Sequence, residues 1–251
     1  MRKRFFTVIL TLCFCCMVGC SDVNLEHIVE VPEPSIGVVH STPVPHSDFY
    51  IPNLLVEDVI VYFNEICLDA EIVNSGNPNL IQKWTSPIYY ALHGDYTQED
   101  LDVFFSFVEW LNGIEGFPGM YPADDLNPCN LRIYFCDRKS LVQHMGETYY
   151  GMDGAVTFWY ENDEIYDAII CYCTEVNQFT RNSVILEEIY NGLGPVQDTQ
   201  LRLDSVVYAG FSEPQALTAV DELILKLLYH PEMKCGMNGT QCEAVIRELY
   251  Y

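Results

Sequence analysis

Basic residues are scarce in this chain. Its 251 residues include 12 lysines and arginines against 36 aspartates and glutamates, a formal net charge of -24 at pH 7. A surface this acidic repels the phosphate backbones of DNA and RNA, so we expect no nucleic-acid partner. Glycine and proline, at 15 and 13 residues, are not in excess, which excludes collagen-like and low-complexity chains. Apolar residues make up 49% of the chain, enough for a sizeable core.

The chain also lacks an apolar run long enough to span a bilayer, which needs about 20 residues. Its N terminus instead has the parts of a secretory signal: basic residues at 2–4, an apolar run over 5–18, and Gly19-Cys20. Met17-Val18-Gly19-Cys20 resembles a bacterial lipobox, whose cysteine becomes the lipidated first residue of the mature protein. We therefore expect a signal peptide at 1–19, lipidation of Cys20, and export to the extracytoplasmic side of the bacterial membrane. An ordinary signal peptide or an uncleaved anchor is the alternative.

Beyond the signal, the sequence predicts a tether and one folded domain. Residues 20–53 contain scattered prolines and little apolar periodicity, which predicts an extended, lipidated tether. Residues 54–251 alternate between helical and strand-like patterns, which predicts one α+β domain with a mixed sheet. The expected helices cover 56–70, 97–113, 138–145, 181–193, 217–229 and 241–250, and the expected strands cover 87–93, 131–136, 154–160 and 165–173.

Cysteine motifs for zinc are missing. There is no CxxC, and no histidine follows a cysteine pair at ligand spacing. An exported protein can form disulfides, and short loops could be closed by Cys129 with Cys136 and by Cys235 with Cys242. Cys171 and Cys173 alternate along a predicted strand, so they share one sheet face and are unsuited to pair. The pairing stays open among seven residues: Cys67, Cys129, Cys136, Cys171, Cys173, Cys235 and Cys242.

The segment 184–198 has the spacing of a metal-protease motif without its histidines. It is similar to the metzincin pattern HExxHxxGxxH, in which ligands at i and i+4 share a helix face. The three ligand positions hold Glu187, Asn191 and Gln197, and the general-base position holds Glu188. Residues 204–208 resemble the Met-turn of those proteases, and residues 217–229 resemble their closing helix. The positions that would support the motif are Gly194, Asp198, Ser205, Tyr208 and Asp221.

The whole domain also resembles a bacterial lipoprotein family, domain of unknown function 2927, which is placed with zincin-like proteins. The matching positions are Trp84-Thr85-Ser86-Pro87, Glu187-Glu188, Leu193-Gly194, Asp198, Ser205-Val206-Val207, Leu217-Thr218, Asp221, Leu228-Tyr229 and Gly236-Met237. The resemblance implies a zincin-like (metzincin-type) α+β fold with an active-site-type helix, and it implies no activity. Asn191 departs from the family pattern, where glutamine is expected.

The residues at the motif leave several interpretations open. Zinc prefers imidazole and thiolate, so Glu187, Asn191 and Gln197 predict no zinc and no cofactor, although zinc remains the alternative. A hydrogen-bond network among these three would replace the metal, with one acid of the Glu187-Glu188 pair bonded to backbone or to Arg181. The preferred function is peptide or protein binding in the former substrate groove. The alternatives are a metal-assisted hydrolase that uses Glu188 as its catalytic base, and a structural envelope domain.

Two further expectations concern the packing of the domain. The histidines at 93, 144 and 230 fall on separate predicted elements, which indicates structural roles rather than a metal site. The helices at 181–193 and 217–229 should pack together through their apolar faces. The expected contributors to that contact are Leu186, Ile189, Leu193, Leu223, Leu227 and Leu228.

Overall fold

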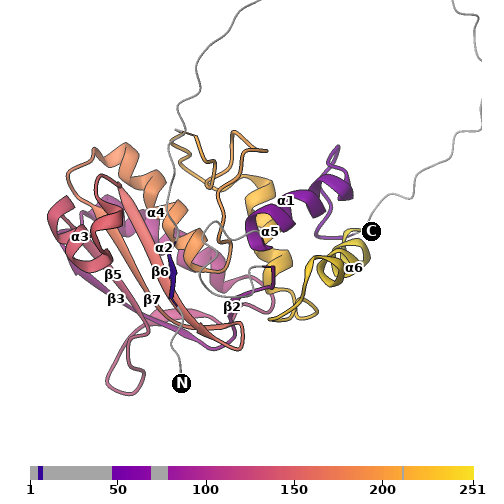
Figure 1. The fold of residues 1–251 in the computed structure, drawn as a ribbon, viewed down its shortest axis with the longest axis horizontal. Coiled ribbons are helices and arrows are strands. Elements are labelled where there is room, and N and C mark those ends of the chain that lie inside the picture. The colour runs from indigo at the N-terminus through magenta and orange to yellow at the C-terminus, as the bar shows by residue number, and fades with distance from the viewer. Residues whose placement is uncertain (1–4, 8–46, 69–78, 211) are drawn as a thin grey trace, which may run out of the picture.

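The computed structural model describes residues 5–7, 47–68, 79–210 and 212–251. Cys20 and most of the predicted tether lie outside the described residues. Figure 1 shows a sheet covered by helices, with a second group of helices beside it. Helices and strands intermix in one α/β domain, as the sequence predicts. Among the described residues, no helix is long and apolar enough to cross a membrane.

The described residues form six α-helices, one 3-10 helix and seven strands. The helices are α1 (Val56–Leu68), α2 (Gln98–Asn112), α3 (Arg138–Met145), η1 (Glu147–Tyr149), α4 (Gln178–Gly192), α5 (Ala219–Tyr229) and α6 (Gly239–Tyr250). The strands are β1 (Phe5–Thr7), β2 (Lys83–Trp84), β3 (Ile88–Gly94), β4 (Met120–Pro122), β5 (Leu131–Cys136), β6 (Gly154–Glu161) and β7 (Glu164–Cys173). All predicted helices and strands are present, and α4 begins three residues before its predicted start.

The strands form one mixed sheet in the order β1-β6-β7-β5-β3-β4, and β2 also pairs with β7. The pairs among β3, β4, β5 and β7 are parallel, whereas β6 and β7 form an antiparallel hairpin. The hairpin turn contains Asn162 and Asp163, which both have positive φ, a conformation that asparagine and aspartate tolerate. β6 is therefore the last long strand at its edge of the sheet.

Side-chain capping sets the boundaries of the helices that the sequence predicts best. Thr97 and Asp100 form a capping box at the start of α2, which ends before Gly113. Thr218 and Asp221 form the same motif at the start of α5. These bonds satisfy amide groups that a helix leaves free in its first turn. They depend only on residues close in sequence.

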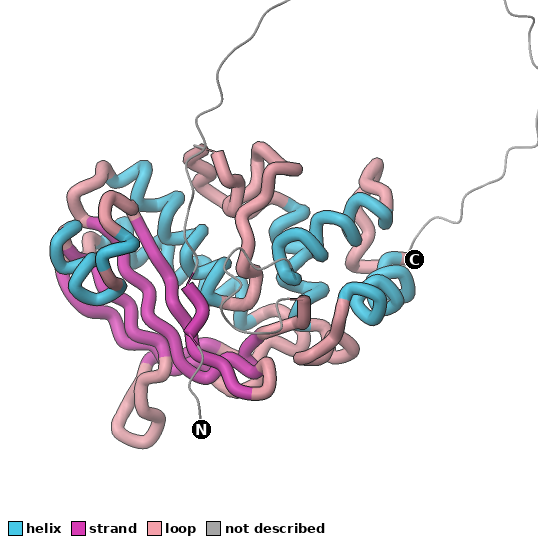
Figure 2. The backbone as a smooth tube through the Cα atoms, viewed as in Figure 1, coloured by secondary structure: helices cyan, strands magenta, loops and turns pink. Residues whose placement is uncertain are grey.

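The two faces of the sheet are covered differently. α2 and α4 pack together, and α4 lies against β6 and β7 on the face of the main core, whereas α3 and η1 cover the other face. Figures 1 and 2 show α1, α5 and α6 grouped beside the sheet. The six leucine and isoleucine positions predicted between α4 and α5 are all buried in the main core. Both helices thus contribute to one core, and Tyr190 Oη of α4 donates to Asp221 O of α5 at 3.0 Å. The extensive helix contact of α4 is with α2 rather than α5, so the predicted direct packing of α4 on α5 is only partly confirmed.

The predicted loop closures between cysteines are wrong in this structure. All seven cysteines of the described domain are free thiols. Cys129 and Cys136 stand at opposite ends of a segment that contains the extended strand β5, and such a segment separates its ends by about 20 Å. Cys242 is buried in α6, whereas Cys235 lies in the preceding turn with its Sγ 3.8 Å from Lys83 O. Cys171 and Cys173 share one sheet face, as predicted.

Candidate functional site

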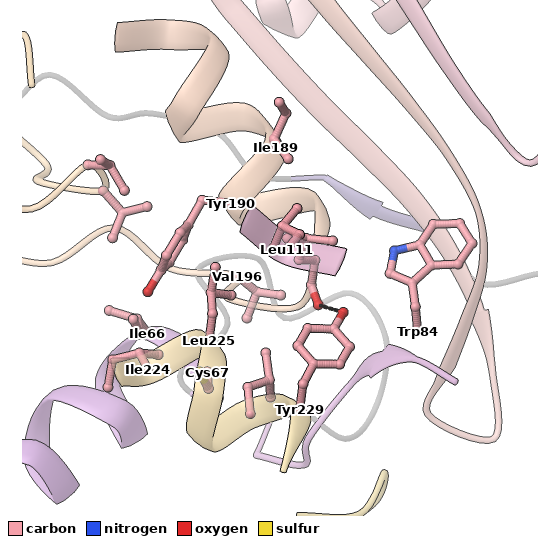
Figure 3. Close-up of a cluster of buried hydrophobic side chains, with 14 of the residues drawn as sticks. Ile66, Cys67, Trp84, Leu111, Ile189, Tyr190, Val196, Ile224, Leu225 and Tyr229 are labelled. Atoms are coloured by element: carbon pink, nitrogen blue, oxygen red, sulfur yellow. Dashed lines mark hydrogen bonds between the residues drawn. The ribbon is translucent and has the colours of Figure 1, made fainter. Parts of the chain in front are cut away.

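The candidate site is built on the C-terminal half of α4, whose end is fixed by two aromatic side chains. Trp84 Nε1 donates to Gly192 O at 2.9 Å, and Tyr229 Oη donates to Leu193 O at 2.7 Å. Figure 3 shows Trp84 and Tyr229 near the end of this helix, together with Tyr190. Carbonyl groups at a helix end lack partners within the helix, so these bonds satisfy and orient them. Sequence reasoning missed this role because the strand that carries Trp84 is only two residues long.

Gly194 turns the chain back toward α4. Its φ is 129°, and a Cβ atom there would lie 2.4 Å from Gln82 O, so only glycine fits without a shift. After the turn, Val196 N donates to Ile66 O at 2.7 Å, which ties the returning segment to α1. The sharp turn brings Asp198 toward the helix that carries Glu187 and Glu188, and Gln197 is its neighbour in the chain. The electrostatic effect of Asp198 on both glutamates supports this arrangement.

Glu188 lies between α4 and the start of β6. A Cβ atom built on Gly154 would lie 2.9 Å from Glu188 Oε1, so the carboxyl group occupies space that a side chain on β6 would need. Burial raises the pKa of Glu188 to about 8, and the charge of Asp198 adds to the effect. Burial is also the main cause that raises the pKa of Glu187, and the charges of Glu188, Asp198 and Asp153 raise it further. The site is thus a crowded group of acids that resist ionising together.

Arg181 is not bonded to either acid of the Glu187-Glu188 pair, although we expected Arg181 as one of two alternative partners for the buried acid of that pair. Its Nε donates to Asp100 Oδ1 at 2.7 Å, in an ion pair whose side chains are 6% and 0% exposed. Burial would raise the pKa of Asp100, but the hydrogen bonds from Arg181 and Thr97 outweigh burial and lower it. The pair joins α4 to α2. The two residues of the pair are far apart in sequence, so no local sequence pattern predicts their contact.

The predicted hydrogen-bond network among the former ligand positions is not formed. Asn191 is 2% exposed, and its Oδ1 atom is buried without a hydrogen-bond partner. Gln197 Oε1 is also buried without a hydrogen-bond partner. Buried polar atoms in native proteins are nearly always paired, so each exception requires an explanation. Together with the neighbouring acids, these two amide oxygens form a buried group of hydrogen-bond acceptors.

This donor set does not fit zinc. Glu187, Asn191 and Gln197 offer oxygen atoms, whereas zinc sites use imidazole or thiolate ligands for the most part. Among the described residues, no three His, Cys, Asp or Glu side chains are arranged to hold a metal ion. The histidines lie elsewhere. His93 and His144 both stack on Tyr134, with ring centroids 4.9 and 4.0 Å away, and His230 contacts Phe49.

A second polar group lies beside Tyr190 of α4 and is fully bonded. Ser205 Oγ donates to Asp221 Oδ1 at 2.7 Å and accepts from Tyr62 Oη at 2.7 Å. Asp221 Oδ2 accepts from Thr218 N and Thr218 Oγ, both at 2.9 Å. These hydrogen bonds hold the turn at 205–208 in place against the core, and Val207 in this turn is fully buried. Tyr208 lies at the turn's end and is partly exposed. Tyr62 was missed because its spacing in α1 suits any core residue.

The outer edge of β6 is the other feature close to the site. β1, three residues long, pairs antiparallel with it, from Phe5 opposite Trp159 to Thr7 opposite Thr157 (Figure 1). Cys173 N donates to Asp153 O, so by alternation the polar groups of Gly154, Val156 and Phe158 point away from β7, to the outer edge. β1 lies within the segment predicted to be a signal peptide. Removal of that segment would leave these groups without β1.

Two cavities of the domain lie away from this site. One, of about 640 Å³, is lined by residues that include Phe49, Trp110 and His230. The other, of about 450 Å³, lies between α2, α4 and the segment before α5. Its lining includes Asn182 and Leu186, on the α4 face that meets α2. Neither is lined by the acids at the end of α4.

The fold and the site define a single mixed α/β domain with a polar, acidic group between the end of one helix and an edge strand. A sequence model of the family described as "Protein of unknown function (DUF2927)" matches residues 57–248. The chain therefore belongs to this family, and the resemblance inferred from its motifs is confirmed at that level. No curated protein and no solved structure matches the chain.

Proposed function

We propose that this protein is a lipid-anchored envelope protein whose degenerate metalloprotease-like, zincin-like domain binds a peptide or protein segment without cleaving it. The segment adds as a strand to the outer edge of β6 and passes the acids at the end of α4. The observation that carries this proposal is the pairing of β6 with β1, a three-residue segment of the predicted signal peptide. The mature protein lacks β1, and its exposed edge is a template for another strand.

The chemistry at α4 favours binding over hydrolysis. A general base must accept a proton from water, and a zinc ion normally lowers the pKa of that water. The former ligand positions hold no imidazole, and burial raises the pKa of Glu188, which favours the protonated form of its carboxyl group. A protonated carboxyl group donates and accepts hydrogen bonds but does not serve as a base. The group is therefore suited to holding a ligand.

The experiment uses the processed protein, purified from membranes in detergent, and short fluorescent peptides of alternating threonine and valine. Two isomers carry N-methyl groups on alternate residues, so that each blocks one edge of the peptide strand. Strand addition predicts that one isomer binds as the parent does and the other loses at least about tenfold in affinity. Equal binding of both isomers contradicts strand addition.

The rival function, a hydrolase that uses Glu188, is tested in the same samples. Mass spectrometry of a diverse peptide library should detect no cleavage by the wild type or by Glu188→Gln. Cleavage by the wild type that is lost in Glu188→Gln would establish the hydrolase, because the amide cannot accept the proton. A structural envelope domain predicts neither binding nor cleavage.

Anchoring through Cys20 is tested separately. Cys20→Ala should abolish lipidation, so the protein should leave the membrane fraction or keep its signal peptide. Cell fractionation and intact-mass measurement separate these outcomes. A mature-sized Cys20→Ala protein that stays in the membrane fraction as the wild type does would contradict lipid anchoring.

A further inference from the structure

We infer that the segment bound at β6 carries a basic side chain, lysine or arginine, which is received by the oxygen atoms of Glu187, Asn191 and Gln197. This inference rests on the proposed function and names the class of ligand for the same site. It follows from three features of the described residues: the nature of the unpaired atoms, the helix face on which they lie, and the register of β6.

The unpaired atoms are all hydrogen-bond acceptors. Asn191 Oδ1 and Gln197 Oε1 are buried without a donor. Asn191 lies about one helical turn after Glu187, and Gln197 precedes Asp198, whose charge raises the pKa of both Glu187 and Glu188. Acceptors of this kind are satisfied by ammonium or guanidinium groups, which carry several N–H donors and a positive charge. Arg181, the basic residue of α4, does not serve here, because it is bound to Asp100.

The helix directs these side chains toward the β6 edge. Asn182 faces α2, because its Nδ2 donates to Glu99 Oε1 at 2.8 Å. Asn191 follows nine residues later, and at about 100° per residue it points to the opposite side of α4. Glu187 precedes Asn191 by four residues and shares its face. Because α2 lies beside α4 and the sheet ends at β6 and β1, this face is the one nearest the edge strand.

The register of β6 then fixes which ligand side chains can reach the acids. A strand in the place of β1 runs antiparallel, so three residues beyond the position of Thr7 it lies opposite Gly154. A side chain on Gly154 would meet Val184 and Glu188 of α4, and Val156 shares that face. Ligand residues opposite Gly154 or Val156 therefore point toward α4. A basic residue shifted by one position points to the other face of the sheet.

A hard metal cation has related chemistry, but the site suits it less well. Calcium takes six to eight oxygen ligands at once. Among the residues that the structure describes, no three acidic, histidine or cysteine side chains surround a common point. One or two carboxyl groups and two amides are enough for a single ammonium or guanidinium group.

The test is a positional set of eight-residue threonine-valine peptides, each with a single lysine at a different position, measured by fluorescence anisotropy with the processed protein in detergent. Norleucine peptides are the neutral controls. Lysine should bind about tenfold more tightly than norleucine at positions two residues apart, and should gain nothing at the positions between. Arginine should behave as lysine does.

Glu187→Gln and Asn191→Leu should each remove most of the lysine advantage, which is the ratio of lysine-peptide to norleucine-peptide affinity measured on the same variant. Glu248→Gln is the matched control, because Glu248 is an exposed acid on α6, and it should keep the full advantage. Equal binding of lysine and norleucine peptides overturns this inference while strand addition stands. Failure of every peptide overturns both proposals. Loss of the lysine advantage in calcium at about 1 mM, with stoichiometric calcium binding, would assign the site to a metal ion.

Discussion

Two buried polar groups border α4, and they differ in how completely their hydrogen bonds are made. Around Asp221, each carboxylate oxygen accepts hydrogen bonds, from Ser205 and Tyr62 on one side and from Thr218 on the other. Around Glu187, the oxygens of Asn191 and Gln197 have no donor. A saturated buried network stabilises the fold, whereas an unsaturated one costs stability. The first group is therefore structural, and the second is the group that we propose receives a ligand.

Asp221→Ala should have the largest effect on stability, about 3–5 kcal/mol in the free energy of unfolding. It removes the acceptor of Ser205 and Tyr62 and the capping box of α5 in one step. Urea unfolding followed by circular dichroism measures the loss. The neighbouring Glu222→Ala, which breaks only an exposed pair with Lys226, is the control and should change little. An Asp221→Ala protein as stable as this control would show that the network is not structural.

Ionisation of Glu188 should give the next largest effect, a fall of a few kcal/mol in the free energy of unfolding between about pH 5 and pH 8. The pKa of Glu188 is about 8 in the folded protein and near 4.5 when unfolded. Between these values the folded state holds a proton that the unfolded state releases, so stability falls as the pH rises. The charge of Asp198 acts on both acids, and Glu187 titrates in the same direction. From β7, Tyr172 faces Glu188 with a hydroxyl whose pKa is raised by burial and then by that glutamate.

Urea unfolding at a series of pH values checks this prediction. Glu188→Gln removes the proton linkage, so its stability should vary less with pH and should exceed that of the wild type near pH 8. If the stability of the two proteins varied with pH in the same way, the pH dependence would have to come from groups other than Glu188.

Gly194→Ala should cost about 1–3 kcal/mol, because alanine tolerates a φ of 129° poorly and its Cβ would approach Gln82 O at 2.4 Å. It should also weaken peptide binding, since the turn positions Gln197. Gly146→Ala is the matched control: Gly146 has a φ of 111° with no atom within 4 Å of its Cβ position. Equal losses in the two variants would mean that backbone strain alone sets the cost.

The difference between local and long-range contacts explains what could be predicted from sequence. The caps of α2 and α5 were predictable because Thr97 and Thr218 bond to groups three residues away. The short strands β2 and β4 and the roles of Trp84 and Tyr62 were not, because their partners are distant in the chain. Motif spacing identified residues of both polar groups, with the exception of Tyr62. It could not tell which group is saturated, since that depends on contacts with α1, α2 and the segment after Gly194.

Asn191→Leu tests the central claim most directly, through urea unfolding measured with and without a saturating lysine peptide. The change replaces an unpaired acceptor by an apolar side chain of similar size, so without peptide the variant should be as stable as the wild type or up to about 1 kcal/mol more stable. With peptide, the wild type should gain stability through binding, and the variant should gain much less. A variant that is strongly destabilised without peptide, or that gains as much as the wild type with it, would contradict the claim that the unpaired acceptor of Asn191 receives a basic side chain.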